Sequence, residues 1–218
     1  MIGDPILIDE HDKSFAQRFL NYIRIDSSYP HSIITIGGPS GSHKTEKAHA
    51  LLRELNKSGF KVKVITQDDL YRISPLNRQS YREYHGIDCV GVDELDWNLV
   101  NCICQDYRMG FPVWMPRYDT CAEHFEWVNW ASGDVDFLII EGIYANFLKP
   151  RLDVTPRFSI FLNLTPEQTY QFRKIRAKEN PDNAFRKAVV QKEYKICLES
   201  KKHAKFIVDF DNNIEIRD

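Results

Sequence analysis

The chain has 218 residues, of which 43% are hydrophobic and 28% are charged, and its formal net charge is −2. This length and composition predict one globular domain with at most a small appendage, and they exclude a disordered or collagen-like chain. The near-neutral charge argues against a protein that binds nucleic acid over its whole surface, and no apolar run approaches the roughly 18 residues of a membrane span.

Helical patterns and short apolar runs alternate along the chain. Phe15, Phe19 and Ile23 recur every fourth residue, which predicts a helix over 12–25 with Asp12 as its N-cap. The other predicted elements are strands over 33–36, 61–65, 137–140, 158–162 and 206–209, and helices over 44–58, which Gly59 ends, and 95–110.

This alternation predicts an α/β fold with a parallel sheet flanked by helices. Residues 70–95 are rich in Tyr, Arg and Asp and have no clear period, so we expect an ordered insert that covers a site. Residues 173–205 hold eleven Lys or Arg and four Asp or Glu. This run of positive charge has two interpretations, a solvated helix face or a cationic lid over a polyanion.

A glycine- and serine-rich loop joins the first predicted strand to the next helix, and residues 37–45 read GGPSGSHKT. This is the context of a phosphate-binding loop. Glycines let backbone N–H groups turn inward, and the helix N-terminus adds partial positive charge. The lysine reaches the terminal phosphates, and the hydroxyl that follows it binds Mg²⁺. The predicted nucleotide-binding residues are Gly38, Ser40, Gly41, Ser42, His43, Lys44 and Thr45.

One position of this loop departs from the consensus G-x-x-x-x-G-K-[ST], because His43 stands where a glycine is expected. Histidine tolerates a positive φ better than most residues but less well than glycine, and its ring adds bulk beside a nucleotide. The alternative is a Gly/Ser turn followed by chance by Lys-Thr. The strand-loop-helix context favours the phosphate loop.

Four further motifs follow the loop in a set order. They are T-Q-D-D-L-Y over 66–71, P-R-Y-D over 116–119 followed by His124, D-F-L-I-I-E-G over 136–142, and R-K-I-R over 173–176. With the phosphate loop, they resemble the motifs of the uridine kinase/phosphoribulokinase family of P-loop kinases. The resemblance covers about residues 32–210, and its specificity comes from the order and spacing of the motifs together.

The resemblance implies a P-loop NTPase-type parallel sheet flanked by helices, with a helical lid. It divides the chain into an N-terminal helical extension over 1–31 and a kinase domain over 32–218. Within that domain we expect a substrate-covering insert over about 70–132 and a lid over about 170–190.

Catalytic and metal-binding roles are implied for three side chains. The resemblance makes Asp68, at the end of the second strand, the base that accepts the proton of the attacking hydroxyl. A helix-capping role for Asp68, or the adjacent Asp69 as the base, remains open. Glu141 ends a buried strand, where an unpartnered charge is costly, and it resembles the family carboxylate near Mg²⁺. Thr45 would supply a second oxygen.

Arg173 and Arg176 lie three residues apart and share a helix face. The resemblance implies that they clamp the transferring phosphoryl group. The family continues with Arg-Asp, whereas this chain reads Ala177-Lys178, so one lid cation is missing or has moved to Lys178 or Arg186. An ordinary exposed basic helix is the alternative.

The acceptor site is the weakest part of the resemblance. Tyr71, Tyr118 and His124 resemble positions that hold the acceptor in nucleoside kinases, although tyrosine is also a common core residue. The family aspartate that holds the sugar hydroxyls aligns with Val90 here, and Asp88 is the nearest substitute. A hydroxyl-binding site without its polar partner discriminates strongly against its former ligand.

The expected function is therefore a kinase that uses ATP and Mg²⁺ and transfers the γ-phosphoryl group to a hydroxyl of a nucleoside-like small molecule. Two alternatives remain. One is a kinase of another acceptor, such as pantothenate, a sugar phosphate or a riboside. The other is a nucleotide-binding module with impaired catalysis, which His43, Glu46 and Ala177-Lys178 motivate.

The expected partner is a small-molecule acceptor, with no nucleic acid and no membrane, and the sequence does not predict an oligomeric state. The first five residues lack the basic-then-apolar start of a secretory signal. The five cysteines are odd in number and too sparse for a disulfide framework. We therefore expect a cytoplasmic protein.

Overall fold

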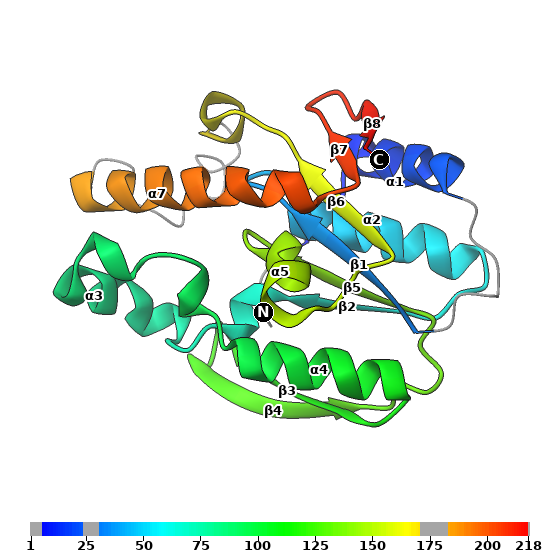
Figure 1. Ribbon diagram of the computed structural model, residues 1–218, viewed down its shortest axis with the longest axis horizontal. Helices are drawn as coiled ribbons and strands as arrows, with labels where there is room; N and C mark the ends of the chain where they lie inside the picture. The colour runs from blue at the N-terminus through cyan, green and yellow to red at the C-terminus, as the bar shows by residue number, and fades with distance from the viewer. Residues whose placement is uncertain (1–5, 24–30, 171–182, 218) are drawn as a thin grey trace.

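A six-stranded sheet forms the centre of the molecule (Figure 1). The computed structural model describes residues 6–23, 31–170 and 183–217. The strand order is β2-β5-β1-β6-β7-β8, and all neighbours are parallel except the pair β7-β8. The strands are β1 (Ser32–Gly37), β2 (Val62–Thr66), β5 (Phe137–Gly142), β6 (Phe158–Leu162), β7 (Phe206–Val208) and β8 (Ile214–Ile216). The predicted parallel sheet is thus confirmed, with one antiparallel edge strand that the sequence analysis missed.

Helices cover both faces of this sheet (Figure 1). Helices α1 (Glu10–Tyr22) and α2 (Lys44–Lys57) pack on one face, where Phe15, Phe19 and Leu51 join the core. The other face is covered by α4 (Trp97–Met109), α5 (Leu148–Leu152) and α7 (Ala184–Ser200). Because β1 and β5 lie between these two layers, almost every residue of both strands is buried, and this is why they read as continuous apolar runs.

Helix α1 begins earlier than the sequence analysis predicted. Asp9, and not Asp12, is the N-cap: its Oδ1 accepts a hydrogen bond of 2.8 Å from the Asp12 amide. Asp12 is the third helical residue and completes a capping box by accepting from the Asp9 amide. The helix ends at Tyr22, and the predicted positions 24 and 25 lie outside the described residues.

The insert after β2 is ordered, as expected for residues 70–95, and contains a helix that the sequence analysis did not predict. This helix is α3 (Pro75–His85), with Ser74 as its N-cap and Pro75 in its first turn. After α4 follows an antiparallel hairpin, β3 (Val113–Asp119) and β4 (His124–Trp130). Short 3-10 turns lie at Gln67–Leu70, Ile87–Cys89, Val92–Glu94, Ala145–Phe147 and Lys201–His203.

A buried ion-pair cluster ties this insert to α7. Arg82 of α3 donates to both oxygens of Glu94 over 2.7 and 2.9 Å, and to Glu193 of α7 over 2.9 Å. All three side chains are almost fully buried. The insert and α7 are therefore fixed relative to each other. Within the described part of the chain, no helix is long and apolar enough to cross a membrane.

Candidate functional site

Three strand ends meet at the carboxyl edge of the sheet. β5 lies between β1 and β2, with Gly142 in register with Gly37 and Glu141 in register with Thr66. The loop after β1, the turn after β2 and the last charged residue of β5 are thus neighbours. Ligands bind at this edge in open α/β sheets.

The loop after β1 needs a compact backbone. At Gly38, a Cβ atom would lie 2.9 Å from both the Leu162 Cβ and the Ser42 Oγ, so the loop has no room for a larger residue there. Gly41 has φ +80°, which a side chain disfavours. The buried Ser42 hydroxyl has no hydrogen-bond partner among the described residues. His43 then starts α2 in the left-handed region, with φ 60° and ψ 31°.

The lysine of this loop folds back across it. Lys44 is buried, and its Nζ donates a 2.8 Å hydrogen bond to the carbonyl of Pro39. Burial raises the pKa of the neighbouring Glu141, and the positive charge of Lys44 opposes part of that rise. The ammonium is therefore held against the backbone of the loop.

Glu141 is a buried carboxyl at the edge of the sheet. Its Oε1 accepts a 3.0 Å hydrogen bond from the Thr45 hydroxyl. Burial raises the pKa of Glu141, and the nearby Asp68 acts in the same direction, while Lys44 and Thr66 oppose the shift only in part. A carboxylate and a hydroxyl side by side provide the oxygen ligands that Mg²⁺ prefers. The donor set therefore fits Mg²⁺.

The two aspartates after β2 have different surroundings. The Asp68 side chain is 49% exposed, and its Oδ1 lies 3.7 Å from Arg78. Asp69 is 3% exposed, and its Oδ1 accepts from the Tyr118 amide over 3.0 Å. Burial raises the pKa of Asp69. Thr66 caps the 3-10 turn by accepting from the Asp68 amide, so the carboxylate of Asp68 is not the cap.

The predicted acceptor residues fall into two groups, of which the first is buried. The Tyr71 ring lies under the Arg78 guanidinium, 3.6 Å from it. Burial raises the pKa of Tyr71 well above its usual range. Tyr118 is buried and packs edge-to-face on Phe125. Val90 is buried as well. Tyr71 directly follows the turn that carries Asp68, and the Tyr118 amide bonds to Asp69 of that turn.

The second group faces solvent. The Asp88 side chain is fully exposed and pairs with Lys192 of α7 over 3.7 Å. His124 opens β4, is about half exposed, and lies 3.5 Å from Glu126. Neither side chain makes a described contact with Asp68 or Glu141. Their roles in binding the acceptor therefore stay predictions.

The structure describes only some of the residues that were predicted to form the lid. Arg173, Arg176 and Lys178 lie outside the described residues. Arg186, the other candidate for a moved lid cation, lies in the first turn of α7. Burial raises the pKa of Glu193 on the same helix, and the charge of Arg186 opposes part of that rise.

Sequence reasoning missed Arg78. It lies on α3, its side chain is 15% exposed, and it contacts both Asp68 and the Tyr71 ring. Arg78 and Arg82 are four residues apart on α3, so they share one face of that helix. This spacing was the signal that could have found them.

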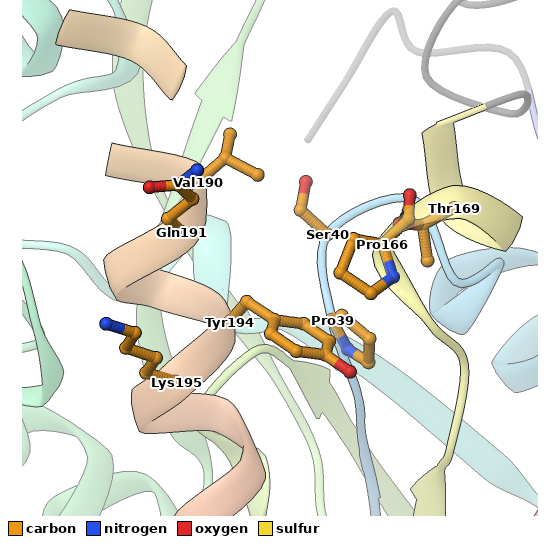
Figure 2. Close-up of a pocket in the computed structure, with 8 residues that line it drawn as sticks. All are labelled: Pro39, Ser40, Pro166, Thr169, Val190, Gln191, Tyr194 and Lys195. Atoms are coloured by element: carbon orange, nitrogen blue, oxygen red, sulfur yellow. Dashed lines mark hydrogen bonds between the residues drawn. The ribbon is translucent and has the colours of Figure 1, made fainter. Parts of the chain in front are cut away.

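A cleft of about 130 Å³ adjoins the phosphate loop (Figure 2). Pro39 and Ser40 form one wall, and Tyr194 extends from α7 toward Pro39 and Pro166. The loop and α7 therefore face each other across an opening into which the Tyr194 ring extends.

Comparisons with known proteins agree with this architecture. Residues 33–180 match the model of the Phosphoribulokinase / Uridine kinase family. The uridine kinase of Ureaplasma parvum serovar 3 is 28% identical over 159 residues, which are 72% of this chain and 74% of that protein. The uridine kinase of Mycoplasma pneumoniae is 28% identical over 136 residues, 62% of each chain. The chain thus spans less than two thirds of the length of that relative.

The fold is shared with solved structures. A possible uridine kinase from Bacillus stearothermophilus superposes with a TM-score of 0.57 at 19% identity, over 90% of this chain and 96% of that one. The family match extends over more than half of the 218 residues and contains the phosphate loop, Asp68 and Glu141. This chain belongs to the phosphoribulokinase/uridine kinase family.

Proposed function

We propose that this protein transfers the γ-phosphoryl group of ATP, in the presence of Mg²⁺, to a hydroxyl of a small-molecule acceptor. The observation that carries the proposal is the meeting of the loop with Lys44, the buried Glu141 and the accessible Asp68 at three neighbouring strand ends. Family membership supports the same reaction.

The nucleotide would be held by the residues around α2. Backbone N–H groups of the loop and the N-terminus of α2 would bind the phosphates, with Lys44 neutralising their charge. Thr45 and Glu141 would hold Mg²⁺, directly or through water. When bound, Mg²⁺ stabilises the negative charge that develops on the phosphate oxygens. The proposed clamp by Arg173 and Arg176 rests on the family resemblance alone.

The proposed chemical step is an in-line displacement. The acceptor oxygen forms a bond to the γ-phosphorus, the bond from that phosphorus to the bridging oxygen breaks, and ADP leaves. The hydroxyl proton passes to Asp68. Asp68 suits this role because its carboxylate is accessible, whereas the Asp69 carboxylate is buried and engaged by the hairpin. A base of this kind contributes about 10²–10⁴ in rate.

We propose a nucleoside-like acceptor as the first candidate. Its support is the identity with relatives named uridine kinase and the buried rings of Tyr71 and Tyr118 beside the Asp68 turn. The weak point of this candidate is Val90, a buried apolar side chain where the family resemblance expects the aspartate for the sugar hydroxyls.

A second candidate, an anionic acceptor such as a sugar phosphate or pantothenate, is favoured by Arg78. Its guanidinium carbon lies over the Tyr71 ring, 3.6 Å from the ring centre, and its Nη1 atom lies 3.7 Å from the proposed base. An arginine held in this way can bind a carboxylate or phosphate group through paired hydrogen bonds. It would then place the acceptor hydroxyl near Asp68.

One assay tests the function and separates the candidates. ADP release is measured with MgATP over nucleosides, pantothenate and pentose phosphates, with Lys44→Ala as the loop control. Under the first candidate, nucleosides support turnover and Arg78→Met changes their KM by less than about threefold. Under the second candidate, only anionic acceptors support turnover, and Arg78→Met raises the KM for those acceptors at least about tenfold.

Two outcomes contradict the proposal. Tight binding of MgATP without acceptor-dependent ADP formation across the panel would indicate a nucleotide-binding module with impaired catalysis. Full activity of Lys44→Ala would show that the loop does not bind the transferred phosphates.

A further inference from the structure

Two features that lie outside the family match or the loop consensus meet in space. Helix α1 precedes the residues that match the family, which begin at residue 33, and His43 replaces a glycine of the loop consensus. The Nδ1 atom of His43 lies 3.7 Å from the Oδ1 atom of Asp12 on α1. Asp12 is fully buried and the His43 side chain is 19% exposed, so this contact, which is longer than a hydrogen bond, is largely shielded from solvent.

His43 adopts a conformation that favours glycine. Its φ of 60° and ψ of 31° lie in the left-handed region, where a Cβ atom is disfavoured. His43 is also the N-cap of α2, yet its side chain makes no capping hydrogen bond. The conformation is therefore not stabilised by the cap itself, and a contact elsewhere has to offset the strain.

Asp12 contacts α2 at two positions one turn apart. Besides His43, its Oδ1 lies 3.6 Å from the Nζ of Lys47, which is almost fully buried. Lys47 also donates to the Oδ1 of Asn212 over 2.9 Å, and Asn212 donates to the carbonyl of His11 over 2.8 Å. The start of α2 is thereby fixed to both α1 and the turn before β8.

The buried carboxylate of Asp12 has a cation beside it, the ammonium of Lys47. Burial raises the pKa of Asp12, but His43, Lys47 and the Asp9 amide together lower it below its usual value. Atoms of Asp9, Asp12 and His43 lie within 4.8 Å of one another, a spacing that would suit a metal ion. The Lys47 ammonium already supplies a cation there, so the cluster is better explained as a structural ion pair.

The position of Asp12 is set by the core. Phe15 and Phe19, one and two turns further along α1, are fully buried in the cluster that α1 shares with α2. Asp12 therefore cannot move away from His43 without disturbing this packing.

We propose that Asp12 is a positioning residue for the phosphate loop. Its buried carboxylate, carried by α1, holds His43 in the left-handed conformation that the consensus glycine adopts without strain. This inference rests on the proposed function, because it requires the loop to bind a nucleotide.

A double-mutant cycle tests it. The Kd for MgATP is measured by titration calorimetry for the unmodified protein, Asp12→Asn, His43→Gly and the double variant. Asp12→Asn weakens binding about tenfold, the scale on which a side chain disfavours the left-handed region. Whatever the Kd of His43→Gly itself, Asp12→Asn changes the Kd by less than about twofold in that background. Glu10→Gln, the same charge change at an exposed position of α1, is the matched control.

A second comparison leaves α1 intact. His43→Ala keeps the Cβ atom but loses the partner of Asp12, so it binds MgATP about tenfold more weakly than His43→Gly. Thermal unfolding is recorded for every variant. The inference would be overturned if Asp12→Asn lowered the affinity equally in the unmodified protein and in the His43→Gly variant. Normal binding by both Asp12→Asn and His43→Ala would overturn it as well.

The two hypotheses fail differently. If the unmodified protein and His43→Gly both fail to bind MgATP, the proposed function is wrong. If both bind and the cycle shows no coupling, only the role of Asp12 is wrong.

Discussion

The Thr45 hydroxyl donates to the Oε1 atom of Glu141 over 3.0 Å, which joins the first turn of α2 to the end of β5. The two residues are 96 positions apart in the chain. Their contact forms because β5 pairs directly with β1, the strand that leads into the phosphate loop. Thr45 and Glu141 are the two side chains that we propose as holding Mg²⁺.

Glu141→Gln keeps an acceptor for Thr45 but removes the negative charge. We expect acceptor-dependent ADP release to fall about 100-fold, because stabilisation by a bound metal contributes several kcal/mol. Titration with MgCl₂ measures the effect, and half-maximal activity should require more Mg²⁺. Glu215→Gln, an exposed change on β8, is the control. An unchanged Mg²⁺ dependence would remove Glu141 from the proposed metal site.

The same substitution should stabilise the protein at neutral pH in the absence of metal. The pKa of Glu141 is raised in the folded state, so ionising this group favours unfolding as the pH rises above the unfolded pKa of about 4.3. The melting temperature of Glu141→Gln should therefore exceed that of the unmodified protein at pH 7. The gain should vanish below about pH 3, where the group is protonated in both states. A difference that does not depend on pH would contradict this account.

Asp68→Asn should lower kcat by about 10²–10⁴ and leave the KM for ATP nearly unchanged, because the proton acceptor is lost while the phosphate loop is intact. Asp69→Asn is the matched control, since it makes the same change one residue away in a buried carboxyl that accepts from the Tyr118 amide. We expect at most a tenfold loss of kcat for Asp69→Asn, because its amide oxygen can still accept from the Tyr118 amide. The reverse pattern in steady-state kinetics would assign the base to Asp69.

Arg82→Met should destabilise the fold by about 3–5 kcal/mol, because it leaves two buried carboxylates without their cation. Urea unfolding measures this free energy. Lys57→Met breaks an exposed ion pair with Glu54 and should change it by less than about 1 kcal/mol. Equal effects of the two substitutions would mean that the Arg82 cluster does not hold the insert against α7.

Elements with a strong local pattern were predictable. The apolar runs of β1 and β5 and the fourfold spacing of Phe15 and Phe19 indicate burial whatever lies opposite them. The hairpin β3–β4 was missed because its alternation is irregular. Pro116 interrupts β3, and Trp127 points an apolar ring at solvent. Such a strand is possible because β3 pairs with β4 alone among the described strands.

By itself, the sequence determined the phosphate loop, the main strands and the family resemblance, since these depend on residue types at fixed short spacings. Only the tertiary structure decided that Asp68 is half exposed while Asp69 is buried, that Arg78 lies beside Asp68, and that Asp12 faces His43. The physical reason is that a local pattern records the preferences of the backbone and which face of an element is apolar. Which side chains meet across two elements is set by how those elements pack, and residues distant in the sequence control that packing.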